Sequence, residues 1–214
     1  MPRTRASRGP TRRRFANWLS ALALASLLGT GAQAETIVDV QRDGDIYVVH
    51  ASGRVAADQR VAWDALTDYD HLNEFVPDIE RSHVVLRDGN RLIVEHVGAF
   101  RLMFFEMPVR VRLAVQHDPY QRVLARTEPG KVGDEEPTLK SVSSQYRLTP
   151  LPAPAGGVRV DYDARFGLGD MLPEFLDSLF GRRVVEHGLR RHFEAMLSEI
   201  ERRQRVLTSV TGTR

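Results

Sequence analysis

DMLPEFLDSLFGRRVVEHGLRRHFEAMLSEIERRQRVL, residues 170–207, is the stretch that decides the fold. Its apolar residues recur at the spacing of a helix with one apolar face: Leu172, Phe175, Leu176, Leu179, Phe180, Val185, Leu189, Phe193, Met196, Leu197, Ile200 and Leu207. Opposite charges four residues apart, such as Glu186 with Arg190 and Glu199 with Arg203, indicate that the other face is solvated. Gly181 weakens the helix, so we expect a kink or break there. Such a helix needs a sheet to cover its stripe.

The residues before this helix supply that sheet. Val158–Phe166 alternates strictly between apolar and charged residues, and weaker alternation predicts strands at 46–55, 81–86, 91–97, 102–116, 121–126 and 140–148. Short helices are expected near 58–66 and 71–76, with a turn at 98–100 and a loose start at 35–45. The fold class is therefore α+β, with a curved antiparallel sheet wrapped around a long C-terminal helix. The space between them could hold an apolar ligand.

The first residues have the order of a secretory signal. An acid-free start with six arginines precedes the apolar run Trp18–Leu28, and Ala32-Gln33-Ala34 offers a cleavage site before Glu35. We therefore expect a signal peptide at 1–34, one domain at 35–214, and a periplasmic or secreted mature protein. A disordered basic tail followed by a buried helix is the alternative. Thr11–Ala16 resembles the twin-arginine export motif, although the general export route stays open.

Charge and cysteine content exclude several functions. The chain has 30 Lys+Arg and 28 Asp+Glu, but removing the six leader arginines leaves 24 against 28, a net charge of −4. The mature chain thus gives no support to nucleic-acid binding. With no cysteine, disulfides, thiolate nucleophiles and cysteine metal sites are all excluded.

The segment Val55–Ile79 carries a family resemblance. Its Asp58, the helix pattern from Val61 and Trp63 to Asp68, and the Phe75 and Pro77 that follow are similar to the opening of START-like (SRPBCC) proteins. The most similar branch is that of polyketide cyclase/dehydrase and coenzyme Q-binding proteins. The resemblance implies a helix-grip fold over nearly all of the mature chain, and a cavity for a hydrophobic ligand.

No motif of catalysis or metal binding stands out. None of the seven histidines pairs at HxxxH or HExxH spacing, and no G-x-S-x-G motif occurs. We expect no metal, no cofactor and no assignable catalytic residue. His96 deserves separate notice because, if it faces inward with Leu92 and Val94, it is a polar group in an apolar pocket.

Soft apolar side chains are the pocket candidates. Met and Phe adapt to varied apolar ligands, and in a START-like fold one strand cluster and the start of the last helix would face each other at the cavity mouth. The predicted ligand-binding residues are Met103, Phe105, Met107, Phe166, Met171, Phe175, Leu179 and His96. Ordinary core packing is the competing interpretation for each of them.

The sequence therefore predicts an exported protein that binds a hydrophobic small molecule or lipid of quinone, fatty-acid or polyketide type. A cyclase or dehydrase acting in the same cavity is one alternative, and a protein-interaction module with a filled core is another. The expected partners are the ligand and a transient membrane contact, without nucleic acid. The oligomeric state is left open.

Overall fold

A computed structural model describes residues 36–102, 105–139, 141–168 and 181–211, apart from the side chains of residues 100–102 and 105. The chain divides into two units, Met1–Gln33 and Ala34–Arg214, and the second holds every described residue. The expected signal segment and its cleavage site therefore lie outside the described residues.

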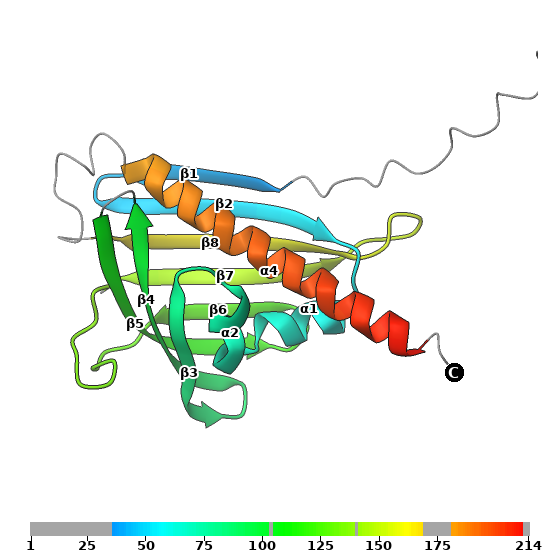
Figure 1. The fold of residues 1–214 in the computed structure, drawn as a ribbon, viewed down its shortest axis with the longest axis horizontal. Coiled ribbons are helices and arrows are strands. Elements are labelled where there is room, and N and C mark those ends of the chain that lie inside the picture. The colour runs from blue at the N-terminus through cyan, green and yellow to red at the C-terminus, as the bar shows by residue number, and fades with distance from the viewer. Residues whose placement is uncertain (1–35, 103–104, 140, 169–180, 212–214) are drawn as a thin grey trace, which may run out of the picture. The chain divides into compact units, whose positions relative to one another are not determined.

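Eight antiparallel strands form one sheet in the order β1-β2-β8-β7-β6-β5-β4-β3. Their bounds are β1 (Ile37–Asp43), β2 (Ile46–Val55), β3 (Ile79–Asp88), β4 (Arg91–Leu102), β5 (Phe105–Asp118), β6 (Arg122–Thr127), β7 (Val142–Pro150) and β8 (Val158–Gly167). The sheet curves strongly, and the long helix α4 (Arg182–Thr211) crosses it on the side that also carries α1 (Gln59–Leu66) and α2 (Leu72–Phe75) (Figure 1). The predicted α+β helix-grip class is confirmed.

The apolar stripe of α4 packs on β2 and its neighbours. The buried helix residues include Val185, Phe193, Met196, Leu197 and Ile200, and the last of these has no exposed surface. The helix approaches β2 at Gly53, where an added Cβ would lie 2.4 Å from Leu197 Cδ1. A side chain at this position would therefore require Leu197 to move. None of the described helices is long and apolar enough to span a membrane.

The short helices form a lid that hydrogen bonds hold in place. Trp63 of α1 meets His117 edge-on with ring centroids 5.1 Å apart, and the hydroxyl of Tyr69 lies 2.8 Å from Nε2 of the same histidine. Tyr69 belongs to the 3₁₀ turn η1 (Tyr69–His71) between α1 and α2. Arg203 of α4 donates from Nη2 to Asp68 Oδ2 over 2.8 Å. Residues of the sequence motif therefore anchor the lid to the sheet and to α4.

Three details of the sequence prediction were wrong. The start of the domain is a strand, β1, because Val38 and Val40 are buried and the whole segment pairs with β2. The expected turn at 98–100 is absent, since β4 continues through Gly98, which gives room to the backbone oxygen of Asp78. The last helix ends at Thr211, beyond the predicted Leu207, while residues 169–180 at its expected start lie outside the described residues.

Candidate functional site

A cavity of about 210 Å³ lies between the sheet and α4. Strands β4, β5, β7 and β8 and helix α4 line it with apolar side chains, among them Val97, Val109, Val111, Val142, Phe166 and Leu189. An apolar cavity of about 150 Å³ can hold a benzene molecule. The part of the cavity bounded by described residues is therefore large enough for a compact ring system.

His96 brings a polar group to this apolar lining. It follows Leu92 and Val94 at alternate positions of β4, and both of these are buried on the inward face. Its Nδ1 lies 2.9 Å from the Ser82 hydroxyl on β3, directly across the ladder. Burial, with a smaller contribution from the nearby His83, lowers the pKa of His96 to about 4. The ring is therefore neutral at pH 7.

Tyr162 is the second polar group of the lining. Burial raises the pKa of Tyr162 to about 12, although a side-chain hydrogen bond with Ser144 acts in the opposite direction. Its ring lies on that of Tyr146, with centroids 4.5 Å apart, and burial also raises the pKa of Tyr146. Both phenols are neutral at pH 7, so they act as hydrogen-bonding groups and not as charges.

Asp78 and His192 bring the remaining ionisable groups to the cavity. Asp78 precedes β3 with a φ of 65°, in the left-handed region, and its backbone oxygen accepts from the Ala99 N–H over 3.0 Å. Its Oδ2 lies 3.5 Å from Arg191 Nη1 and 3.6 Å from His192 Nε2 on α4. Burial lowers the pKa of His192 despite the attraction of Asp78. These contacts link the loop before β3 to the helix that covers the sheet.

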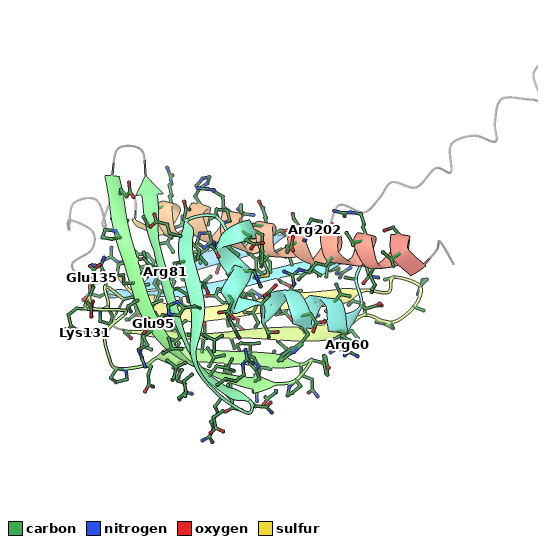
Figure 2. The ribbon with its side chains drawn as sticks, turned by 60° about the horizontal axis from the view of Figure 1, so that its bottom comes forward. Arg60, Arg81, Glu95, Lys131, Glu135 and Arg202 are labelled. Carbon is green, nitrogen blue, oxygen red and sulfur yellow. The ribbon has the colours of Figure 1, made fainter. Side chains whose placement is uncertain are left out.

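A second polar cluster lies on the opposite face of the sheet. Glu95 is only 5% exposed, accepts from Arg112 Nη1 over 2.6 Å, and lies 3.6 Å from His83 Nε2. Arg112 also donates to the Lys131 carbonyl, so the loop after β6 is held over Glu95 (Figure 2). The cluster anchors this loop. Among the described residues, no group of three or more His, Cys, Asp and Glu side chains is arranged to hold a metal ion.

The structure brings two of the predicted binding residues to the cavity, His96 and Phe166. Met107 is buried at 8% exposure in the hydrophobic core and is not part of this lining. The side chain of Phe105, together with Met103, Met171, Phe175 and Leu179, lies outside the described residues. The predicted mouth between strand and helix therefore lies outside them as well.

Sequence reasoning missed Tyr162, Asp78 and His192 as cavity residues. The alternation of β8 already placed Tyr162 on the apolar face, so a phenol among valines was the available signal. Asp78 and His192 are far apart in sequence and carry no motif. Only the packing of α4 on the loop before β3 brings them together.

The fold and its cavity define a START-like protein of the helix-grip class. Residues 55–193 match the sequence model of the family described as polyketide cyclase / dehydrase and lipid transport, and the chain belongs to that family. A comparison with curated proteins found no match.

Solved structures share the fold at low sequence identity. The Zhui aromatase/cyclase from Streptomyces is 18% identical with a TM-score of 0.57, over 74% of this chain and 95% of that one. A STAR-related lipid transfer protein fragment from Xanthomonas axonopodis is 14% identical with a TM-score of 0.56, over 76% and 98%. Human StAR-related lipid transfer protein 5 is 10% identical with a TM-score of 0.55, over 77% and 86%. These likenesses establish the fold alone.

Proposed function

We propose that the mature protein binds a hydrophobic small molecule or lipid, of quinone, fatty-acid or polyketide type, between the sheet and α4. The observation that carries the proposal is the cavity of about 210 Å³, whose lining is mostly apolar with a few polar groups. That composition is typical of small-molecule sites. Membership of the family supports hydrophobic ligand binding or cyclase/dehydrase-like activity.

Burial of apolar surface would supply the affinity. A ligand with the area of an aromatic side chain buries about 150–250 Å². At about 25 cal/mol per Å² this gives about 4–6 kcal/mol before the cost of association. Even before that cost, about 4–6 kcal/mol corresponds to a dissociation constant between about 1 mM and about 40 μM. Binding of one ring system should therefore be weak, and larger ligands should bind more tightly.

The test enlarges a side chain that borders the cavity and, as a matched control, one in the filled core. Val142→Phe on β7 occupies cavity space, whereas Val160→Phe on β8 enters a site with no exposed surface. We expect Val142→Phe to abolish binding of 2-naphthol, a neutral fluorescent probe with two fused rings, with little change in melting temperature. Val160→Phe should cost about 1–3 kcal/mol of stability through overpacking.

Two outcomes would refute this function. Unchanged probe binding by Val142→Phe would place the ligand elsewhere. Equal destabilisation by both variants, with no probe bound by the parent protein, would favour the interaction module with a filled core. Mass spectrometry of small molecules that co-purify with the protein would then identify the natural ligand class.

We also propose that the protein acts after export. The arginine-rich start, the short apolar run and Ala32-Gln33-Ala34 support this. N-terminal sequencing of protein from the periplasmic fraction should begin at Glu35 or within a few residues of it. Replacing Arg12 and Arg13 by Lys should block export by the twin-arginine route, and undiminished export would favour the general route. An intact N-terminus on cytoplasmic protein would refute export.

A cyclase or dehydrase acting in the same cavity is the second candidate. The observation that favours it is the presence of His96, Tyr162, Asp78 and His192 around one apolar space, because enzymes gather ionisable groups in such sites. Incubating the co-purified ligand with a trace of protein separates the two functions. Conversion of many ligand molecules per protein would establish an enzyme, and recovery of unchanged ligand would establish a binding protein.

A further inference from the structure

We infer that the cavity selects neutral ligands that carry a carbonyl or hydroxyl group and discriminates against carboxylates, an inference that rests on the proposed binding function. The deciding groups are His96 and Tyr162, which would hydrogen-bond the ligand, and Asp78, which would repel an anion. Fatty acids in their ionised form are thereby disfavoured, and ketones, quinones, amides and alcohols with ring systems are favoured.

The charged side chains around the cavity disfavour an anionic ligand. The described residues that line it include no lysine or arginine, and one carboxylate, that of Asp78. From α4, His192 faces Asp78 at 3.6 Å and Arg191 at 3.5 Å, but Arg191 is 43% exposed and lies outside the lining. The ionisable side chains that β4 and β8 contribute to the described lining are those of His96 and Tyr162. Among the described residues, the basic side chains near the cavity that could attract a ligand carboxylate therefore already lie beside Asp78.

The protonation states of these groups agree with that geometry. Burial lowers the pKa of His96 to about 4 and raises the pKa of Tyr162 to about 12, so both are uncharged at pH 7. Burial also lowers the pKa of His192. Moving an ionised carboxylate from water into such a site without a partner is strongly unfavourable.

The polar groups of the lining can hydrogen-bond a neutral ligand. Nδ1 of His96 is occupied by Ser82, whose hydroxyl can donate to it and leave a proton on Nε2. The Tyr162 phenol, which also has a side-chain hydrogen bond with Ser144, adds a hydroxyl group. These two groups suit a ligand carbonyl, which accepts, or a hydroxyl, which does both. A site built to hydrogen-bond such a group rejects analogues that lack it.

The volume of the cavity determines which probe molecules can test this selectivity. If about 150 Å³ holds one benzene ring, about 210 Å³ suits two fused rings. 2-Naphthamide and 2-naphthoate have nearly the same shape and differ in charge, and naphthalene lacks the polar group altogether. Their dissociation constants at pH 7.4, measured by calorimetry on the mature protein, test the inference.

We expect 2-naphthamide to bind at least tenfold more tightly than 2-naphthoate. Tyr162→Phe should weaken the binding of 2-naphthamide about three- to tenfold, which corresponds to the loss of one hydrogen bond. The same variant should leave the affinity for naphthalene unchanged. Asp78→Asn should reduce the ratio of the 2-naphthoate dissociation constant to the 2-naphthamide dissociation constant at least threefold. This variant keeps the backbone, because Asn tolerates the left-handed region in which Asp78 lies. Asp88→Asn, on the exposed hairpin between β3 and β4, is the matched control and should change nothing.

The outcomes separate this inference from the function on which it rests. If 2-naphthoate binds as tightly as 2-naphthamide, the selectivity is refuted while ligand binding stands. If Asp78→Asn and Asp88→Asn behave alike, Asp78 is not the source of the discrimination. If neither naphthalene nor either derivative binds to the parent protein, the proposed binding function fails and the selectivity fails with it.

Discussion

Replacing Phe193 by alanine should unfold the protein at a much lower temperature. Phe193 is 2% exposed and belongs to the α4 stripe that covers β2. Its Cε1 lies 3.3 Å from the position of a Cβ built on Gly53, so helix and sheet are in direct contact there. Truncation removes a ring at a point where the backbone of β2 already touches the helix.

The expected cost follows from the area that the ring buries. A buried aromatic side chain removes about 150–250 Å² from water, which at about 25 cal/mol per Å² corresponds to about 4–6 kcal/mol as an upper bound. Measured costs of Phe→Ala in cores are about 3–5 kcal/mol, and we expect that range. For a domain of this size, the melting temperature should fall by about 6–20 °C.

Urea denaturation and thermal melting of the mature protein measure this cost. Glu194→Ala is the matched control, because Glu194 is the next residue and is exposed, and its change should cost under about 0.5 kcal/mol. Arg191 is exposed but unsuitable as a control, since it contacts Asp78. Small and equal effects of Phe193→Ala and Glu194→Ala would refute the assignment of the stripe to the core.

Two further predictions concern stability, and a third concerns the pKa of a carboxyl group. Gly98→Ala should cost about 1–3 kcal/mol in urea denaturation, because the added Cβ would lie 2.0 Å from the Asp78 backbone oxygen; wild-type stability would refute that contact. The pKa of His96 falls from 6.5 to about 4 on folding, so the unfolded chain binds more protons between these values and stability should drop as pH is lowered through them. The full effect is about 3 kcal/mol, and His96→Gln should lose less stability than the parent protein between pH 7 and pH 5. Finally, partial burial acts to raise the pKa of Asp68, but hydrogen bonds from His71 and Arg203 outweigh it and lower that pKa. Arg203→Gln should therefore raise the pKa of Asp68 in a carboxyl NMR titration. An unchanged value would contradict the contact.

The sequence by itself determined the architecture, because the signals for it are local. The strict alternation of Val158–Phe166 and the helical stripe around Phe193 each depend only on which face of one element is apolar. The same logic put His96 on one face of its strand with Leu92 and Val94, and the structure shows that this face is the inward one. It failed for β1, whose inward face has only Val38 and Val40, and which is a strand because it pairs with β2. It also failed at Gly98, where glycine is needed for a close approach and not for a turn.

Only the tertiary structure decided which inward residues border empty space. Periodicity gave Tyr162 and Val160 the same face of β8, yet Tyr162 lines the cavity while Val160 is fully buried in the core. The difference depends on what α4 and the opposite strands place against each side chain. The contact of Asp78 with His192 likewise joins a loop to a helix far along the chain. Such contacts have no sequence period, because they arise from the docking of whole elements.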